Sequence, residues 1–366
     1  MDYALLQEYA MQPRAQEETV SYLAEKLSHF VKWMDPVLIC LPDQEPGGLS
    51  HLMEQAVLLC EGVPVTWGRD HRWMSLLRLA FSSRASAIVS TPLIALGLSK
   101  LQNYYSIPLF IRDVVTAGYP CEEWMIEGLC RGFDCNPRGC MSVGTTGIVA
   151  GFSCAKHHGI HIRQDVYQVE IVDGKGEPVP QGEMGEIVLS AKGRPQTRYA
   201  MGENARLTTG RCQCGEDAPL LMNIDPGRTE ADGDLRKLGA TLQSWNSVLD
   251  CRIERSPHGL EMELITLPGG RLPKLPSAAK QVIRPLNPEV DAPFFYDPTQ
   301  KIRKQPLTFE GNVLKYLRYA KTLGKQSGFA CLQERGDWWK PSARSPQATS
   351  FVARDDRDGL LPLQSV

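Results

Sequence analysis

The segment that decides the fold begins as CAKHHGIH (residues 154–161) and ends as CQCG (residues 212–215). Between them, the run GEMGEIVLS (residues 182–190) has the pattern of a β-strand. Two cysteines one residue apart, together with a Cys and a His seven residues apart, can close a tetrahedral, thiolate-rich zinc site if the chain between them folds back. The sequence therefore predicts a strand-rich unit held by one metal cluster, with the ligands Cys154, His161, Cys212 and Cys214.

Two features of this cluster stay open at the level of sequence. His157 and His158 are alternatives to His161, and Cys154 with His161 also fits a core cysteine beside a surface histidine. In the same way, the CQCG segment fits a loop with one free thiol. If four protein groups bind the ion, no coordination position is left open, so we expect a structural zinc.

The overall composition excludes several classes of protein. The chain has 366 residues, enough for two or three domains, and a formal net charge of -2, which does not favour nucleic acid or an anionic membrane as a partner. It lacks a run of about 18 apolar residues and a signal-peptide layout at its start, so we expect a cytoplasmic protein. The cysteine count of 11 is odd, and many lie in apolar runs, which favours reduced core cysteines plus a metal cluster over disulfides.

Upstream of the cluster, strands and helices alternate. Short runs rich in Val and Ile alternate with helical segments of about ten residues, which is typical of a parallel sheet with crossover helices. We expect strands at 37–41, 64–67, 87–90 and 109–117, and helices at 16–33, 49–60, 73–81, 93–101 and 122–131. Ligands of such sheets bind at the carboxyl ends of the strands. Three strand ends carry Gly- and Pro-rich turns that outline one crevice, at 42–48, 90–92 and 117–120.

From residue 166 the pattern changes to short antiparallel strands, at 166–173, 185–191, 197–201 and 205–210, which we interpret as a small β-barrel. Residues 229–234 read as an exposed linker and 242–250 as a helix. The Gly- and Thr-rich run SVGTTG (142–147) has two interpretations, a phosphate-binding loop or a buried strand with a tight turn.

The run from Gly147 through Cys154 and His161 to the Leu at 189, followed by TRYAMGENARL (197–207), CQCG and PGR (226–228), resembles phenylacetate CoA ligases of the acyl-adenylate-forming superfamily. The resemblance covers about residues 36–270 and is most specific from Cys154 to Arg228. It implies a two-step reaction, in which a carboxylate attacks the α-phosphate of ATP to give an acyl-AMP and a thiol then displaces AMP. The implied ligands are a small carboxylic acid, ATP or AMP, magnesium and CoA.

The resemblance also assigns residues. Gly118, Tyr119 and Pro120 match the loop that borders the adenine. Glu203 ends the run YAMGE, which matches a Tyr-x-x-Gly-Asp motif whose carboxylate accepts hydrogen bonds from the ribose hydroxyls. Arg228 matches the Arg that precedes the hinge and lies near the nucleotide phosphate and ribose. The four cluster residues match positions that form a zinc cluster in some members.

The implied fold class is α/β: a parallel-sheet adenylation subdomain, a small antiparallel β-barrel and a smaller, mobile α+β C-terminal domain. The predicted domains are an N-terminal helical segment (1–34), the α/β subdomain (35–150), the β-barrel subdomain with the zinc cluster (151–228), the α+β domain (229–330) and a polar tail (331–366).

The chain departs from the family in its catalytic motifs. Only one helix precedes the Gly47-Gly48 turn, where the family has its phosphate loop further upstream, so the chain resembles an N-terminally shortened member. The family's Tyr-Gly-x-x-Glu motif falls on SVGTTG, so Gly144 or a neighbour replaces the acidic residue that helps to hold magnesium. Candidates for the catalytic lysine rest on position alone and are Lys301, Lys304 and Lys325; the catalytic residues stay unknown.

Two functions follow from these observations. The first is a reduced acyl-adenylate-forming ligase, completed by another chain or weakly active alone. The second is a non-catalytic, zinc-stabilised scaffold that binds a nucleotide, an acyl group or a protein partner, including a second copy of itself. A third, weaker interpretation is an acyl transferase that uses Cys331 as its nucleophile.

Overall fold

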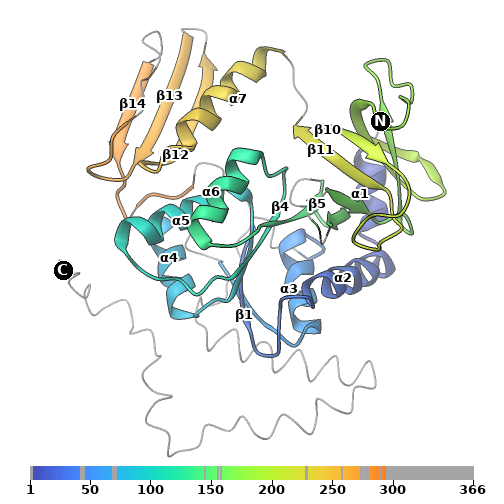
Figure 1. Ribbon diagram of the computed structural model, residues 1–366, viewed down its shortest axis with the longest axis horizontal. Coiled ribbons are helices and arrows are strands. Elements are labelled where there is room, and N and C mark those ends of the chain that lie inside the picture. The colour runs from blue at the N-terminus through green and yellow to red at the C-terminus, as the bar shows by residue number, and fades with distance from the viewer. Residues whose placement is uncertain are drawn as a thin grey trace, which may run out of the picture.

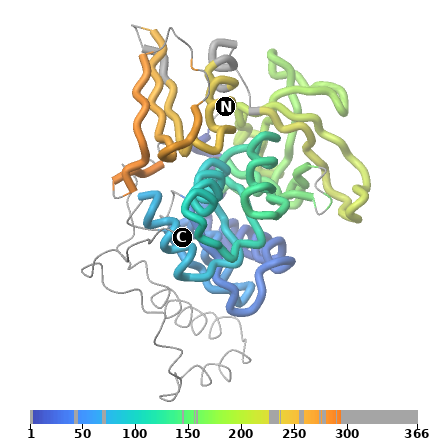
Figure 2. The backbone as a smooth tube through the Cα atoms, turned by 60° about the vertical axis from the view of Figure 1, so that its left-hand side comes forward, coloured from blue at the N-terminus to red at the C-terminus, as the bar shows by residue number. Residues whose placement is uncertain are grey.

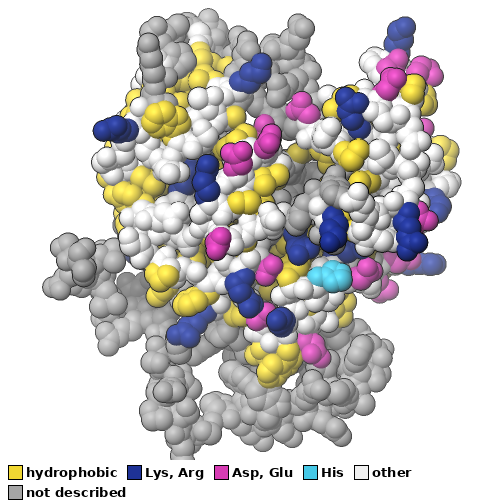
Figure 3. All heavy atoms as spheres, in the orientation of Figure 1, with side chains coloured by type: hydrophobic (Ala, Val, Ile, Leu, Met, Phe, Trp, Pro, Cys, Tyr) yellow, Lys and Arg dark blue, Asp and Glu magenta, His cyan; other side chains and the backbone are white. Residues whose placement is uncertain are grey.

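The computed structural model describes residues 3–41, 46–67, 72–143, 146–154, 156, 159–226, 230–256, 259–272, 275, 280–288 and 290–293. Arg228, His157, His158, the three candidate lysines, Cys331 and the predicted tail lie outside these residues. None of the helices in these ranges is long and apolar enough to cross a membrane. On the face shown in Figure 3, Lys and Arg side chains are interspersed with Asp and Glu side chains.

The first half of the chain is the predicted parallel α/β unit (Figure 1). Five parallel strands lie in the order β2-β1-β3-β4-β5, namely β1 (Pro36–Cys40), β2 (Val63–Thr66), β3 (Ala87–Ser90), β4 (Asp113–Ala117) and β5 (Arg138–Ser142). The helices between them are α3 (Leu49–Leu59), α4 (Trp73–Ser82), α5 (Pro92–Tyr105) and α6 (Glu123–Phe133). The predicted strands and helices are therefore confirmed here, with ends that differ by a few residues.

Helices cover both faces of this sheet, and β1 shows why. Leu38 and Cys40 belong to one core with residues of α4, α5 and α6, whereas Val37 and Ile39 belong to a second core with α3 and α2 (Pro13–Leu27). Successive side chains of a strand point to opposite faces, so an uninterrupted apolar run requires cover on both sides.

The antiparallel strands do not form a sheet of their own. β6 (Val149–Ser153) pairs with β5, and the sheet continues in the order β6-β7-β11-β10-β9-β8. The remaining strands are β7 (Ile160–Ile162), β8 (Tyr167–Val172), β9 (Met184–Ala191), β10 (Arg194–Thr208) and β11 (Leu220–Pro226). The expectation of a small barrel is thus not confirmed: these strands extend one 11-stranded sheet, and helix α1 (Tyr3–Ala10) packs Leu6 and Ala10 into their core.

A smaller α+β unit follows, and two predictions made there are wrong. Its elements are α7 (Glu230–Gln243), β12 (Val248–Ser256), β13 (Gly259–Thr266) and β14 (Lys280–Pro285). Residues 230–234 of the predicted linker are the start of α7, whose Leu238 and Leu242 pack on the sheet. The predicted helix at 242–250 is the end of α7, a turn and the start of β12. The predicted domain boundaries stay predictions. The boundary between residues 150 and 151 falls inside β6, a strand of the continuous sheet.

This unit is docked on α4 and α5, as Figure 2 shows from a second direction. Four of its buried side chains belong to the same core as those two helices, namely Leu249, Ile265, Leu267 and Leu286. At the edge of this core, the Lys100 side chain on α5 is only 7% exposed. Its Nζ donates hydrogen bonds to the carbonyl oxygens of Gln243 (2.5 Å) and Val248 (2.7 Å). Lys100 therefore joins α5 to the turn between α7 and β12.

Lys100 should give this docking a measurable pH dependence. Burial lowers the pKa of Lys100 from 10.5 to about 8, although the nearby Asp250 acts in the opposite direction. Between about pH 8 and 10, the unfolded chain binds a proton that the folded chain has released, so Lys100's contribution to stability rises with pH. The neutral amine keeps two N–H groups, enough for both carbonyls. We expect the unfolding free energy of the wild type, relative to Lys100→Met, to rise by about 1 kcal/mol per pH unit in this range.

The measurement is urea unfolding at pH 7, 8, 9 and 10, with Lys237→Met on the exposed side of α7 as the control. The control should show no such trend relative to the wild type. If the difference in unfolding free energy between wild type and Lys100→Met does not change with pH, the lowered pKa of Lys100 is contradicted.

Candidate functional site

A cavity of about 390 Å³ lies at the carboxyl ends of β4 and β5, where they face β10 and β11. Its walls come from both parts of the sheet and include Tyr119, Pro120, Met141, Ser142, Ile160, Glu203, Leu221 and Ile224. The volume lies in the range of small-molecule sites, and its position is the one where α/β sheets bind ligands. The cavity is therefore the candidate ligand site.

Tyr119 and Pro120 reach the cavity because they follow directly after β4. The Tyr119 hydroxyl accepts a hydrogen bond from the backbone N–H of Leu93 in the first turn of α5 (3.2 Å). Burial raises the pKa of Tyr119, so the phenol remains protonated. Gly118 donates its N–H to Ser142 Oγ (3.2 Å), which fixes the turn, and it lines a neighbouring hollow beside α7 instead of this cavity.

Glu203 enters the cavity from an irregular part of β10. The pairing of β10 with β9 shifts register between Ala200 and Asn204, and Gly202 in that stretch has φ +75°. A positive φ is accessible to glycine at little cost, and a bulge of this kind turns the following side chain away from the regular alternation. The glycine in YAMGE thus explains how Glu203 comes to line the same cavity as Tyr119.

The structure therefore brings together three of the five predicted nucleotide-binding residues in one cavity: Tyr119, Pro120 and Glu203. Gly118 lies beside them, and Arg228 is outside the described residues. Several wall residues were missed in the sequence, among them Asn136, Ser153 and Asn223. The only sequence feature that could have indicated them is their position at a strand end or in an adjacent loop. Many residues that do not line the cavity have the same feature.

The magnesium ion implied by the resemblance does not fit the described residues. Glu203 is the only carboxylate among the described residues that line the cavity. In SVGTTG, Gly147 packs against the turn before α3, so that a Cβ at residue 147 would lie 2.2 Å from the carbonyl oxygen of Gly47. A side chain at that position would overlap backbone, which cannot move aside cheaply. Gly144, where the resemblance places the family's acidic residue, lies outside the described residues, and we assign no step to magnesium.

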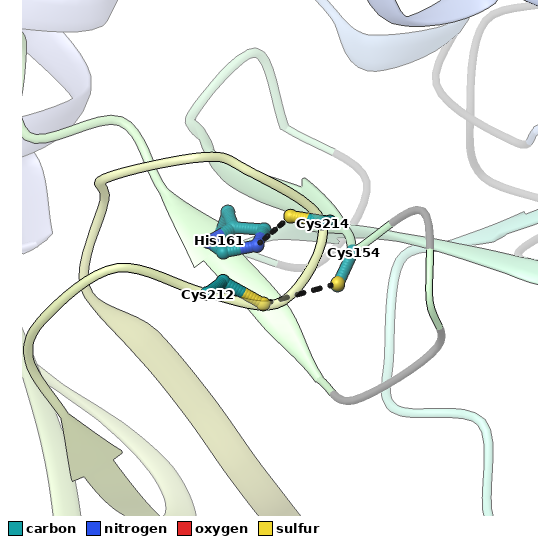
Figure 4. Close-up of side chains that lie close together, drawn as sticks. All are labelled: Cys154, His161, Cys212 and Cys214. Carbon is teal, nitrogen blue, oxygen red and sulfur yellow. Dashed lines mark hydrogen bonds between the residues drawn. The ribbon is translucent and has the colours of Figure 1, made fainter.

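The second site is the predicted metal cluster, whose four side chains lie close together (Figure 4). It adjoins the cavity, because Ser153 and Ile160, which line the cavity, are the chain neighbours of Cys154 and His161. Cys154 directly follows β6, His161 is in the middle of β7, and Cys212 and Cys214 are on the connection from β10 to β11. β6 pairs with β7 and β7 with β11, so that Leu220 lies opposite His161. Sheet pairing thus brings together two segments that are about 50 residues apart in the chain.

The four side chains fit one tetrahedral metal ion. Their ligand atoms all lie within 4.8 Å of one another. Cys154 Sγ is 3.6 Å from Cys212 Sγ, and His161 Nε2 is 3.2 Å from Cys214 Sγ. Ordinary zinc bond lengths in a tetrahedron place two sulfurs about 3.8 Å apart and a sulfur about 3.6 Å from a nitrogen. These two distances are within a few tenths of an ångström of those values, and the other pairs of ligand atoms lie within 4.8 Å.

The surroundings of the cluster suit metal binding as well. His161 is 1% exposed, and its Nδ1 lies 3.3 Å from the carbonyl oxygen of Ala218. With Nδ1 as the donor of that bond, the Nε2 lone pair points at the cluster, which is the usual arrangement of a metal-binding histidine. Gly215, at φ +95°, closes the turn that presents both cysteines, and its N–H donates to the carbonyl oxygen of Cys212 (2.9 Å).

The cluster also contacts the N-terminal helices. Glu216 lies 4.0 Å from His161 Nε2 and 3.5 Å from Lys26 Nζ on α2. Nearby, the buried Arg163 donates to Thr19 Oγ1 of α2 and to the carbonyl oxygen of Val149. These contacts hold α2 against the strands that carry the cluster, and nothing in the sequence pattern indicated them.

The Gly147 contact predicts a large effect of a small substitution. Gly147→Ala should lower the unfolding free energy by about 1–3 kcal/mol, because its methyl group overlaps the Gly47 carbonyl. The control is Gly174→Ala, where the added methyl meets nothing within 4 Å. The unfolding free energies of the two variants are measured by chemical unfolding. Equal stability would show that the backbone at residue 147 is not in contact with the backbone at residue 47.

Comparison with known proteins supports the fold. No protein-family model matches the chain, and no curated protein matches its sequence. Among solved structures, 2-hydroxyisobutyryl-CoA ligase in the postadenylation state, in complex with 2-HIB-AMP, is similar with a TM-score of 0.57 and 14% identity over 82% of this chain and 72% of that chain. The complex of that ligase with R3-HIB-AMP gives the same values.

The open conformation of the same ligase gives a TM-score of 0.49 and 15% identity over 56% of this chain, which then spans about half (51%) of that chain. A benzoate CoA ligase from Burkholderia xenovorans LB400 gives 0.47 and 14%, over 78% of this chain and 64% of that chain. The comparison at a TM-score of 0.57 shows that this chain shares the fold of 2-hydroxyisobutyryl-CoA ligase.

Proposed function

We propose that the protein is a reduced acyl-adenylate-forming ligase related to phenylacetate CoA ligases, which activates a carboxylic acid with ATP. The observation that carries the proposal is the meeting of Tyr119, Pro120 and Glu203 in one cavity, although Glu203 is more than 80 residues further along the chain. The resemblance assigns these three residues to the adenine and ribose. The structural neighbour at TM-score 0.57 was solved with 2-HIB-AMP, a ligand of the same class.

In this proposal the chain's own residues bind and orient. Glu203 accepts hydrogen bonds from the two ribose hydroxyls, and the ring of Tyr119 borders the adenine. The apolar side chains of Ile160, Leu221 and Ile224 line the same cavity and exclude water from the acyl end. The acid's carboxylate attacks the α-phosphate, pyrophosphate leaves, and a thiol such as that of CoA then displaces AMP.

A second candidate is the non-catalytic binding protein. The lining of the cavity favours it, because adenylyl transfer depends mainly on positioning and on neutralising phosphate charge, and the described lining residues include no Lys or Arg and one carboxylate, Glu203. In this alternative the cavity binds the nucleoside end of a ligand and no pyrophosphate is released.

Pyrophosphate exchange distinguishes the ligase from the non-catalytic binding protein, and a Glu203 variant tests the nucleotide site. ATP–pyrophosphate exchange is measured across a panel of aryl and acyl acids, alongside calorimetric titration with AMP and ATP. Loss of hydrogen bonds to a charged group costs about 1.5–3 kcal/mol, so Glu203→Gln should weaken AMP binding by roughly 10–100-fold. The exposed Glu177→Gln, in the turn after β8, is the matched control.

Exchange with any acid supports the ligase. AMP binding without exchange supports the non-catalytic alternative, and a wild type that binds neither nucleotide overturns both.

We also propose that Cys154, His161, Cys212 and Cys214 hold one structural zinc ion. The ligand distances and the Nδ1 contact of His161 support this assignment. Bound there, zinc would crosslink the end of β6, β7 and the connection between β10 and β11. Because all four ligands come from the protein, the ion would serve stability and leave no position for a substrate.

Elemental analysis of purified protein tests the zinc site. We expect one equivalent of zinc in the wild type, its loss in the Cys212→Ser/Cys214→Ser double variant, and a lower unfolding temperature for that variant. Cys130→Ser, on α6 and outside the cluster, should keep the metal. A metal-free wild type that is fully folded would rule out the assignment.

A further inference from the structure

We propose that this cluster is also a redox site, at which peroxide joins Cys154 and Cys212 in a disulfide and expels the metal. The inference rests on the proposed zinc assignment for the metal it releases, although the disulfide itself follows from the thiol positions. Cys154 and Cys212 are adjacent across the cluster, with 3.6 Å between their sulfurs, whereas Cys214 faces His161. The geometry therefore selects one pair among the three cysteines.

Closing this pair requires a small movement of one partner. A disulfide bond is about 2.0 Å long, so the sulfurs must approach by roughly 1.6 Å. Cys154 is fully buried at the end of β6, and its N–H donates to the carbonyl oxygen of Gly159 (2.8 Å). Cys212 is half-buried in the turn before β11. Its backbone N–H donates a hydrogen bond to the carbonyl oxygen of Glu216 (3.0 Å). Because Cys212 is the more exposed of the two cysteines and lies in a turn, it is the one that an oxidant reaches, and we place the movement there.

The chemistry is balanced with hydrogen peroxide as the oxidant. The Cys212 thiolate attacks one peroxide oxygen, the O–O bond breaks, and a sulfenic acid and hydroxide form. The Cys154 thiolate then attacks the Cys212 sulfur, and the second hydroxide leaves as the disulfide forms. Overall, two thiols and one peroxide give one disulfide and two waters. Only His161 and Cys214 then remain as ligands, too few to retain zinc.

The position of the cluster connects this reaction to the cavity. Ser153 and Ile160 line the cavity, and each is the chain neighbour of a cluster residue, Cys154 and His161 respectively. Because successive side chains of a strand point to opposite faces, Ile160 faces the ligand site while His161 faces the metal. Ser153 Oγ also accepts a hydrogen bond from the N–H of Gly139, another cavity residue. Oxidation should therefore change ligand binding as well as metal content.

The test treats the full-length, reduced protein with increasing hydrogen peroxide and follows two readouts. Released zinc is measured with a chromogenic chelator, and disulfides are located by mass spectrometry of non-reduced peptides. We expect a Cys154–Cys212 disulfide as the first product, one zinc released per disulfide, and recovery of both thiols with dithiothreitol. Cys130→Ser should behave as the wild type. Cys154→Ser should leave Cys212 as a sulfenic acid that dimedone traps.

The outcomes separate this inference from the zinc assignment. If the protein proves free of metal, the peptide map still decides, because the same pair should form first. A first disulfide between any other pair, or a several-fold excess of peroxide that leaves Cys154 and Cys212 reduced, would overturn the inference. If Cys154→Ser does not fold, the wild-type peptide map remains sufficient.

Discussion

The antiparallel pairing of β6 with β5 is the contact on which both sites depend. It places Phe152 opposite Cys140 and continues the parallel sheet into the antiparallel strands without a break. Because of this pairing, residues of β10 and β11 line one cavity with residues at the carboxyl ends of β4 and β5, and Glu203 lines it together with Tyr119. The same strand ends at Cys154, so the metal cluster forms directly behind the cavity wall. One strand pair thus determines two sites.

Much of this arrangement could be predicted from sequence where the signal is local. The apolar runs at 37–41 and 87–90 predicted strands that the structure contains. The spacing of Cys154, His161, Cys212 and Cys214 predicted a cluster, and the fold brings these four side chains together. The joined sheet could not be predicted in this way, because a period of two shows that a strand exists and leaves its partner undetermined. The close approach of Gly147 to the Gly47 carbonyl could not be predicted either, since Gly47 is 100 positions earlier in the chain.

The docked C-terminal unit bears on the proposed reaction. The resemblance implies a mobile C-terminal domain, yet here four side chains of that unit share a core with α4 and α5. Exposing them would cost about 1.5–3 kcal/mol each, or roughly 10 kcal/mol together, before the Lys100 hydrogen bonds are counted. A movement of that cost is populated only if another interface replaces the lost burial. Any movement of this unit in the proposed reaction therefore has to bury these four side chains again on another surface.

The zinc proposed for the cluster would stabilise the joined sheet where its pairing is shortest, at β7. β7 has only three residues, yet it links β6 to β11, with register partners at Phe152 and Leu220 on either side of His161. So few ladder hydrogen bonds give a weak connection, because each contributes only about 1 kcal/mol. A metal ion held by β7 and by the chain on both sides of it would crosslink the segments that the short strand joins weakly. On this argument a bound metal would support the cavity through the strand they share, since Ile160 and His161 belong to the same three residues.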